Sequence, residues 1–346
     1  MSHYNYKLIS CLCLILFAAF ACRQEEVKEQ IIQQEKNTYF DFKTPGKFQS
    51  GGVQMISLQE GYKVWTKRIG NAPIKVLLLH GGPAMTHEYM ECFESFFPQA
   101  NIEFYHYDQL GSYYSDKPQD DKLWTIERFV EEVEQVRKAL GLNKDNFFLL
   151  GNSWGGMLAM EYALKYQDNL KGLIICNMTA SFPKYEVYNK QLRSQLRPSL
   201  LDTLKQYEDK KDYHNPLYQE LVLNEYYTRH LCRMPVAEWP EPVARSFAHV
   251  NQHVYEYMQG PSEFVPGGIL KGWDIWDRLK ELKVPTLTVG AKYDTMNPKE
   301  MEEMSKLVQN GRYLYCPNGS HLAMWDDQEV FMQGVIDFIK DTAESK

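Results

Sequence analysis

The sequence predicts an α/β fold with a mainly parallel sheet flanked by helices and with a helical segment inserted between two strands. Short apolar runs of strand length alternate along the chain with longer amphipathic stretches of helix length. Residues 180–272 carry helix-like patterns and many aromatic residues but no apolar run typical of a core strand. With 346 residues, the chain is long enough to bury a large core around such a sheet.

Strand candidates are short apolar runs that end at turn residues, and helix candidates carry apolar residues at helical spacing. Residues 53–58 and 62–68 surround Gly61 and predict an opening hairpin. The segment 125–140 combines an apolar stripe with a glutamate-rich face and ends at Gly141, as expected of an amphipathic helix. Further predicted strands span residues 76–79, 102–107, 147–150, 284–290 and 312–316, and a second predicted helix spans residues 157–166.

The composition is that of a folded protein without a nucleic-acid-binding surface. Hydrophobic residues make up 44% of the chain and charged residues 24%, which excludes disordered, collagen-like and low-complexity chains. The 38 Lys and Arg residues are outnumbered by 45 Asp and Glu residues, which gives a formal net charge of −7. Because binding to a nucleic-acid backbone needs clustered basic residues, nucleic acid is not expected as a partner.

The N-terminus has the pattern of an export signal. An apolar run at residues 8–21 follows Lys7, is too short to span a bilayer as a mature helix, and gives way abruptly to polar residues. The junction resembles a bacterial lipoprotein signal, in which Cys22 would become the lipid-modified first residue. We therefore expect residues 1–22 to be a signal peptide with this cysteine at its end and residues 23–45 to be a flexible tether. The expected location is the bacterial envelope, with a membrane anchor; a secreted or periplasmic soluble form is the alternative.

The motif Gly-x-Ser-x-Gly at residues 151–155 directly follows an apolar strand candidate and directly precedes a helical stretch. In this context the pattern predicts a nucleophile elbow, a sharp turn that lifts the Ser153 hydroxyl above the sheet edge. Glycine is needed at positions 151 and 155 because a side chain two positions from the serine would block so sharp a turn. Ser153 is therefore the predicted nucleophile; the alternative is a glycine-rich turn whose serine only caps the helix.

A serine nucleophile needs a histidine base and a carboxylate that orients it, and behind such an elbow they follow in the order acid, then histidine. Asp294 lies in the turn after the strand candidate 284–290, and His321 lies in the turn after 312–316. Because the carboxyl ends of parallel strands share one sheet edge, Ser153, Asp294 and His321 should meet there. The predicted chemistry is acyl transfer, in which His321 takes the serine proton and Asp294 holds the imidazole.

The oxyanion of such a reaction needs backbone amides as donors, one from the residue after the nucleophile and one from a loop after an earlier strand. The first is the amide of Trp154. For the second, the turn at Gly81 and Gly82 is the candidate, and we favour Gly82 because Pro83 has no N–H and stiffens the turn. Gly81 is expected beside the bound substrate, and His80 is expected to brace the loop.

Several stretches are specific enough to carry a family resemblance. They are HGGPA (80–84), YDQLGSYYSDKP (107–118), GNSWGG (151–156), NEYYTRHLCR (224–233), QGPSEF (259–264), GWDIWDRL (272–279), VGAKYD (289–294) and GSHLAMWDD (319–327). From about residue 48 to the C-terminus, the chain resembles the prolyl aminopeptidases, or proline iminopeptidases, of the α/β-hydrolases, including their tricorn-interacting relatives. The resemblance implies a serine aminopeptidase that removes an N-terminal residue, often proline, from a short peptide, without a metal or other cofactor.

The resemblance also implies a helical cap over the site, which carries a glutamate for the ammonium group of the substrate. That role falls on Glu263 of QGPSEF; taken alone, this residue would be an ordinary solvated loop carboxylate. Residues 46–179 and 273–346 then form the α/β-hydrolase core, and residues 180–272 form the cap. Positions 153 and 294 are indeed separated by far more chain than the intervening core elements need. The aromatic composition of the segment is typical of a lid that lines an apolar pocket.

Four positions, in three stretches of the sequence, depart from the family pattern. Ala84 replaces the last glycine of HGGPG, Leu110 and Tyr114 stand where arginines are common, and Thr295 replaces a second acidic residue after the aspartate. Loss of one of two carboxylates around an ammonium group should weaken its binding by about 1–3 kcal/mol. The requirement for a free N-terminus and the preference for proline are therefore open at this point.

Two other function classes remain. A serine esterase, lactonase or amidase of the same fold would keep the three catalytic residues but would not need Glu263, and a lipoprotein that only binds a ligand would need neither. Epoxide hydrolases and dehalogenases of this fold are disfavoured. In the enzymes of those classes that this chain resembles, an aspartate stands at the elbow, where this chain has Ser153. His249 and His253 could share one face of a helix, but with no third ligand in the pattern we assign no metal.

Overall fold

The computed structural model describes residues 52–344, which belong to one compact unit of the chain. The predicted signal peptide at 1–22 with Cys22, the predicted tether at 23–45 and the first residues of the predicted core lie outside the described residues. Within residues 52–344, no helix combines the length and the apolar character needed to cross a membrane.

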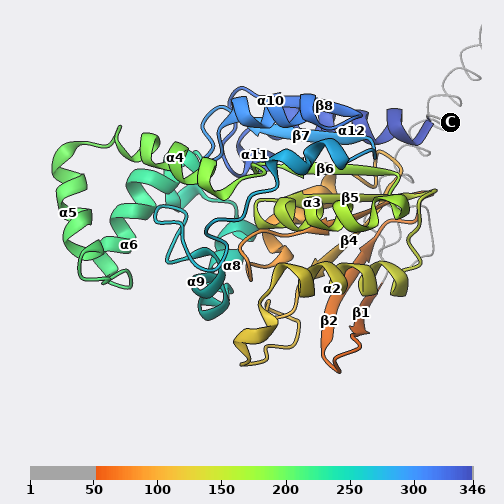
Figure 1. Cartoon of the computed structure of the whole chain (residues 1–346), viewed down its shortest axis with the longest axis horizontal. Coiled ribbons are helices and arrows are strands. Elements are labelled where there is room, and N and C mark those ends of the chain that lie inside the picture. Colours follow the sequence, from red (N-terminus) through yellow and green to blue (C-terminus); the bar gives the residue numbers. More distant parts are fainter. Residues whose placement is uncertain (1–51, 345–346) are drawn as a thin grey trace, which may run out of the picture. The chain divides into compact units, whose positions relative to one another are not determined.

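An eight-stranded sheet forms the centre of the fold (Figure 1). The strands are β1 (Val53–Ser57), β2 (Lys63–Ile69), β3 (Ile74–Leu79), β4 (Ile102–Asp108), β5 (Phe147–Asn152), β6 (Gly172–Cys176), β7 (Thr286–Ala291) and β8 (Gly311–Cys316). Their order is β1-β2-β4-β3-β5-β6-β7-β8; β1–β2 and β2–β4 are antiparallel, and every other neighbouring pair is parallel. The predicted hairpin and the mainly parallel sheet are thus confirmed, and β6 is a strand whose apolar run the sequence analysis did not single out.

Helices cover both faces of this sheet. They are η1 (His87–Ser95), α2 (Ile126–Ala139), α3 (Trp154–Tyr166), α10 (Pro298–Leu307) and α12 (Gln328–Glu344), with shorter elements η2 (Asp121–Leu123), η3 (Gln167–Asn169), η6 (Trp276–Glu281) and α11 (Ala323–Asp326). Successive strand residues point to opposite faces, so Leu149 joins the apolar cluster under α2, α3 and α10, whereas Leu150 joins the cluster under η1 and α12. The strands are therefore buried on both sides, as in other parallel sheets with crossover helices.

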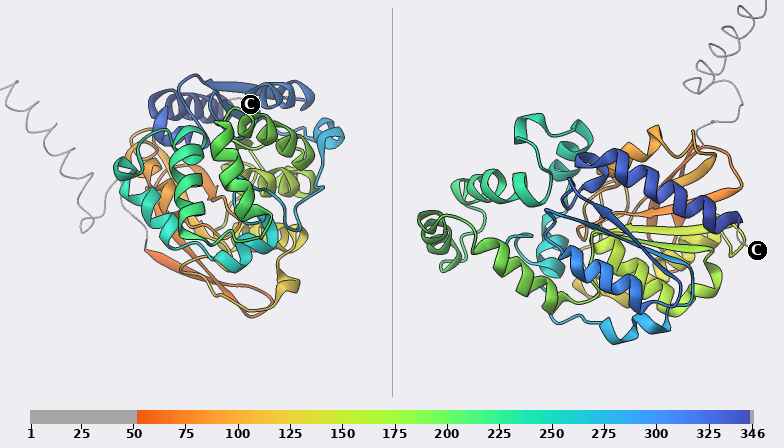
Figure 2. Two further views of the ribbon diagram at one scale, coloured as in Figure 1. Left: turned by 90° about the vertical axis from the view of Figure 1, so that its left-hand side faces the viewer. Right: turned by 90° about the horizontal axis from the view of Figure 1, so that it is seen from above.

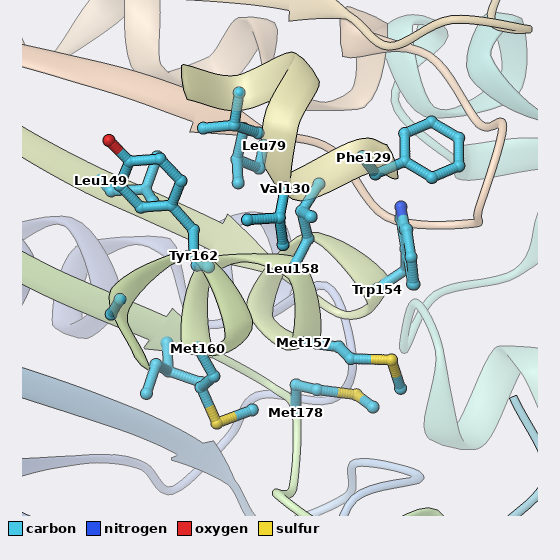
Figure 3. Packing of buried hydrophobic residues seen from close by; sticks show 14 of the residues in the cluster. Leu79, Phe129, Val130, Leu149, Trp154, Met157, Leu158, Met160, Tyr162 and Met178 are labelled. Carbon is cyan, nitrogen blue, oxygen red and sulfur yellow. The ribbon is translucent and has the colours of Figure 1, made fainter. Parts of the chain in front are cut away.

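Figure 3 shows part of the core between the sheet and the helices α2 and α3. Leu149 of β5 belongs to the same buried cluster as Val130 of α2 and as Leu158 and Tyr162 of α3. Burial of a large apolar side chain of this kind contributes about 1.5–3 kcal/mol to stability. This packing fixes α3 against the strand whose end carries Ser153.

Between β6 and β7 the chain forms a cap of helices and loops. These helices are α4 (Phe182–Arg193), α5 (Pro198–Glu208), α6 (Pro216–Val222), the π-helix η4 (Leu223–Tyr227), α7 (Thr228–His230), η5 (Val236–Glu238), α8 (Glu241–Ala248) and α9 (Gln252–Gln259). In the left view of Figure 2 they lie, in green and teal, in front of the sheet. Ser181 and Asp274 form an isolated bridge where the cap leaves and rejoins the core. The boundaries at 180 and 272 stay a prediction.

A network of charged and polar side chains fastens the cap to the core. The carboxylate of Glu88 in η1 is almost fully buried and accepts hydrogen bonds from Arg245 Nη1 at 2.6 Å and His249 Nδ1 at 2.8 Å. Beside it, the hydroxyls of Thr86 and Ser246 are hydrogen-bonded at 2.9 Å. Because a buried carboxylate is costly without its partners, this network holds α8 against the loop that follows β3.

Candidate active site

Ser153 occupies a sharp turn between β5 and α3. Its backbone has a φ of 56° and a ψ of −127°, a conformation that residues other than glycine rarely adopt. A Cβ atom at Gly151 would lie 1.9 Å from the Gly155 carbonyl oxygen, and one at Gly155 would lie 2.0 Å from that of Leu79. Only glycine fits at either position, as a nucleophile elbow requires. The helix α3 begins at Trp154 rather than at residue 157, since the glycines after the serine already belong to its first turn.

His321 and Asp294 come from the turns that follow β8 and β7 and are hydrogen-bonded to each other. His321 Nδ1 lies 2.7 Å from Asp294 Oδ1, and because a carboxylate only accepts, Nδ1 is the donor. Asp294 is fully buried, and its other oxygen accepts a hydrogen bond from Asn177 Nδ2 at 2.7 Å. The neutral imidazole is thus held in the tautomer that leaves Nε2 free to accept a proton.

The charge environment of His321 favours a basic imidazole. Burial lowers the pKa of this histidine, but the charge and the hydrogen bond of the adjacent Asp294 carboxylate, with smaller contributions from Glu263 and Asp326, together raise it by more. The net result is a pKa above the ordinary value of 6.5. A base in this position is matched to proton transfer near neutral pH.

A cavity of about 310 Å³ joins the sheet edge to the cap. Ser153 and His321 line it from the core, and Glu263 lines it from the cap, while Asp294 lies behind the histidine. Most of the other lining residues are apolar or aromatic: Met85, Tyr89, Tyr213, Tyr218, Val222, Leu223, Tyr227, Leu231, Phe247, Val250, Tyr255, Pro261 and Leu322. The structure therefore brings the predicted nucleophile, base and ammonium anchor to one small, mostly apolar chamber.

The loop after β3 places backbone amides at the same cavity. Gly81 and Gly82 both line it, but the Gly81 N–H donates to Tyr89 Oη at 2.7 Å, whereas the Gly82 N–H makes no hydrogen bond to another described residue. Trp154 is the first residue of α3, where an amide has no partner within the helix. Gly82 and Trp154 thus stay the predicted oxyanion donors, and Gly81 lies at the cavity with its amide engaged.

A chain of hydrogen bonds ties this loop to the nucleophile turn. His80 Nε2 accepts from the Gln109 amide at 3.1 Å, and its Nδ1 donates to the Gly81 carbonyl at 2.8 Å. Burial lowers the pKa of His80 to about 4, so the ring is neutral and structural. The Gln109 side chain in turn accepts from the Trp154 indole at 2.8 Å. His80 therefore braces the loop, as its place in the sequence suggests.

Glu263 is a buried carboxylate, only 6% exposed, in the loop that follows α9. Tyr185 Oη donates to its Oε2 at 2.6 Å, and Tyr255 Oη donates to its Oε1 at 3.1 Å. Among residues 52–344, no basic side chain forms an ion pair with it. It is thus not the solvated loop carboxylate of the alternative interpretation, but a buried anion that faces the cavity without a counter-ion.

Thr295 turns toward the histidine and aspartate rather than into the cavity. It is fully buried, and its Oγ1 lies 3.3 Å from both Asp294 Oδ1 and His321 Nδ1. In the described part of the chain, Glu263 is the carboxylate that lines the cavity. An anchor for a cation here consists of one carboxylate.

The cap also contacts the loop that carries the histidine. The His321 amide donates to the His230 carbonyl at 3.0 Å, and the Leu322 amide donates to the Leu231 carbonyl at 2.9 Å. The side chain of Ser320 adds a bond to the same Leu231 carbonyl at 2.8 Å. The position of the histidine therefore depends on the cap as well as on the sheet.

His249 and His253 do not come together as a metal site. His249 contacts Glu88 and stacks on the Tyr113 ring, with ring centroids 3.9 Å apart, while His253 contacts Asp121 on the surface. In the portion of the chain that the structure describes, no group of three histidine, cysteine or acidic side chains is placed to hold a metal ion.

Two asparagines support the site and were missed by the sequence analysis. Asn177 follows β6 directly, has a φ of 54°, and holds Asp294 as described above. Asn152 precedes the nucleophile; its side chain donates to the His321 carbonyl at 3.4 Å and accepts from Tyr89 Oη at 2.9 Å. A polar residue directly after an apolar run is the signal that could have found Asn177, since such positions lie at the functional edge of a parallel sheet.

The comparisons with known proteins first define a class. The family model described as the alpha/beta hydrolase fold matches residues 75–328, which span the sheet from β3 through β8, the cap and the three predicted catalytic positions. The chain belongs to this family, and its strand order and nucleophile turn agree with it.

Within that class, the chain belongs to the proline iminopeptidases. It is 63% identical to the proline iminopeptidase of Flavobacterium johnsoniae over 82% of this chain and 96% of the relative, and 65% identical to that of Elizabethkingia meningoseptica over 81% and 94%. Among solved structures, the proline iminopeptidase of Mycobacterium smegmatis matches with a TM-score of 0.76 at 29% identity, covering 84% of this chain and 99% of that one.

The close packing around the elbow predicts a severe effect of one added methyl group. Gly155→Ala should lower the free energy of unfolding by about 3 kcal/mol and reduce activity about 100-fold, because the backbone must shift away from Leu79 and displace Ser153. Denaturant titration and ester hydrolysis measure the two effects. Gly52→Ala is the control, because a Cβ atom there meets nothing within 4 Å, and it should change neither quantity. Wild-type stability and activity in Gly155→Ala would show that close packing at this glycine is not what shapes the elbow.

Proposed function

We propose that this protein is a serine prolyl aminopeptidase, which releases an N-terminal residue, proline above all, from short peptides through an acyl-enzyme. The observation that carries the proposal is Glu263, a buried carboxylate without a counter-ion in the cavity that Ser153 and His321 line. A substrate with a protonated amine supplies the missing positive charge. Membership of the proline iminopeptidases supports the same conclusion.

The reaction uses Ser153, His321 and Asp294 as nucleophile, base and orienting acid. His321 Nε2 takes the serine proton while Oγ attacks the carbonyl carbon of the first peptide bond. The C–N bond then breaks as the imidazolium returns the proton to the leaving amine, and the shortened peptide departs. Water repeats the sequence on the ester: it loses a proton to His321, Oγ leaves and is reprotonated, and the free amino acid is released.

The amides of Gly82 and Trp154 stabilise the oxyanion in both halves of this reaction. They are fixed before the substrate arrives, since the His80–Gln109–Trp154 bonds hold the loop against the elbow. Donors that need no reorganisation stabilise developing charge more than solvent would, and loss of one such donor typically costs about 3–4 kcal/mol of transition-state stabilisation. No metal or other cofactor enters the proposed reaction.

An esterase, lactonase or amidase without a free-amine requirement is not favoured. Those activities need the same nucleophile and base, but they give no reason to bury Glu263 in the cavity without a counter-ion. A passive ligand-binding protein is also not favoured, because it would need neither the strained Ser153 backbone nor the His321–Asp294 pair.

The location of the enzyme is proposed to be the bacterial envelope, with Cys22 as the lipid-modified residue. The apolar run at 8–21 and the abrupt change to polar residues after Cys22 support this proposal. A tether at 23–45 would let the catalytic unit reach peptides at the membrane surface. A secreted or periplasmic soluble enzyme is the alternative.

The proposed anchor predicts a strict preference for a free amine. We expect kcat/KM on Pro-β-naphthylamide to exceed that on its N-acetyl derivative at least about 100-fold, and Glu263→Gln to lower the former about 10- to 100-fold. Glu220→Gln, which changes an exposed carboxylate of the same cap, should have no effect. Ser153→Ala provides the blank. Equal rates on the acetylated compound, or faster hydrolysis of a p-nitrophenyl ester, would favour the esterase alternative.

The pKa of His321 predicts the acid limb of the pH profile. The base must be neutral to act, and Asp294 raises its pKa above 6.5, so activity should fall to half at a pH above 6.5 as the solution is made more acidic. The measurement is kcat/KM for an uncharged p-nitrophenyl ester, on which only the enzyme titrates. An acid limb at or below pH 6.5 would show that Asp294 does not dominate the environment of the histidine.

If Cys22 carries a lipid anchor, its substitution should change where the enzyme is found after the cells are separated into membrane and soluble fractions. Cys22→Ser should abolish incorporation of a labelled fatty acid and move the enzyme from the membrane fraction to the soluble fraction. Cys13→Ser, within the apolar run, is the matched control and should change neither. A wild-type enzyme that is already soluble and unlabelled would instead support the secreted form.

A further inference from the structure

We infer that Tyr185 and Tyr255 are positioning residues, which hold the Glu263 carboxylate in a fixed orientation so that one carboxylate suffices as the ammonium anchor. This inference rests on the proposed function, because it concerns how the same substrate amine is held. Neither tyrosine belongs to a motif that the sequence analysis singled out. Tyr185 belongs to α4 and Tyr255 to α9, so the carboxylate is held between two different helices of the cap.

Each oxygen of the Glu263 carboxylate has its own phenol donor. Tyr185 Oη lies 2.6 Å from Oε2, and Tyr255 Oη lies 3.1 Å from Oε1, with Gln259 Nε2 at 3.4 Å from the same oxygen. Both tyrosines stay protonated, because burial and then the neighbouring Glu263 carboxylate raise the pKa of each phenol well above its usual range. Two neutral donors thus compensate the buried charge without cancelling it.

The backbone of Glu263 is also fixed by cap helices. Its carbonyl oxygen accepts from Asn189 Nδ2 at 2.7 Å and lies 3.0 Å from Tyr185 Oη, whose one proton is directed to the nearer carboxylate oxygen, and its amide donates to Tyr227 Oη at 3.2 Å. These partners belong to α4 and to the π-helix η4. The main chain and the carboxylate plane are therefore fixed before a substrate enters. This lowers the entropic cost of ordering the site when the substrate binds.

The fixed orientation of Glu263 explains how the site can work without the second acidic residue that commonly follows the catalytic aspartate in the family. Thr295 occupies that position and contacts the histidine and the aspartate, so the cavity presents one negative charge from Glu263. A single charge attracts an ammonium group less strongly than two charges, but a rigid and fully oriented carboxylate loses less on binding. The chemistry that matches such a site is a peptide N-terminus with one positive charge.

Tyr185 gives the sharper test because it does not line the cavity, so its effect on substrate binding must pass through Glu263. In Tyr185→Phe, we expect KM for Pro-β-naphthylamide to rise roughly 10-fold while kcat changes less than about threefold. Tyr255→Phe should act in the same direction. Hydrolysis of an uncharged p-nitrophenyl ester, which needs the nucleophile and base but not the anchor, should stay within about twofold of wild type in both variants.

The matched control is Tyr226→Phe. Tyr226 is a fully buried cap tyrosine like Tyr185, but its hydroxyl has no hydrogen-bond partner in the described part of the protein. Loss of that hydroxyl should leave KM, kcat and the ester rate unchanged and should not lower Tm, since no hydrogen bond is broken. The comparison separates the loss of a donor to Glu263 from the general effect of removing a buried hydroxyl.

A double-mutant cycle decides whether the tyrosine acts through the glutamate. In the Glu263→Gln background, adding Tyr185→Phe should change KM by less than about twofold, because the charge that the phenol positions is already gone. Full additivity of the two effects would overturn the inference, as would an unchanged or lower KM in Tyr185→Phe, or an ester rate that falls in step with peptidase activity. If instead Glu263→Gln leaves the preference for a free amine intact, the proposed function itself fails at the anchor.

Discussion

The site depends on the close approach of α3 to the ends of β5 and β3. At Gly151 and Gly155 the neighbouring carbonyl oxygens occupy the space of any Cβ atom, so helix and strands meet with backbone against backbone. This contact forces the chain through the unusual backbone conformation of Ser153 and raises its hydroxyl above the sheet edge. The strain is carried by the packing of Leu149, Leu158 and their neighbours, which hold helix and sheet together (Figure 3).

The parallel sheet then collects residues that are distant in sequence. Ser153, Asp294 and His321 follow β5, β7 and β8, and parallel strands place all three turns at one edge (Figure 1). Asn177 follows β6, the strand between β5 and β7 that was not predicted from the sequence. Its side chain donates a hydrogen bond to Asp294 and so ties β6 to the aspartate. The histidine turn is held on its other side by the cap, through the backbone carbonyls of residues 230 and 231.

In the proposed function, the cap turns a general acyl-transfer site into one that selects substrates with a charged amine. It contributes a buried carboxylate to an otherwise apolar chamber, and several cap helices hold that carboxylate by phenol and amide donors. The Glu88–Arg245–His249 network holds the cap on η1, which directly follows the loop that carries Gly82. The proposed substrate anchor and the predicted oxyanion donors therefore lie on elements that are fastened to each other, so we expect a displacement of α8 to disturb both.

The sequence by itself determined the fold class, the hairpin, the strands other than β6 and the elbow motif, because these follow from local periodicity and from glycines at fixed spacing. It also pointed to Asp294, His321 and Glu263, the last only through a family resemblance. The tertiary structure decided what Glu263 is, since its two tyrosine donors come from α4 and α9, two helices that precede it at very different distances along the chain. It also decided that Thr295 faces the histidine rather than the cavity, and that α3 starts at Trp154. Hydrogen bonds between distant segments depend on how whole elements pack, and no local pattern of residues specifies that packing.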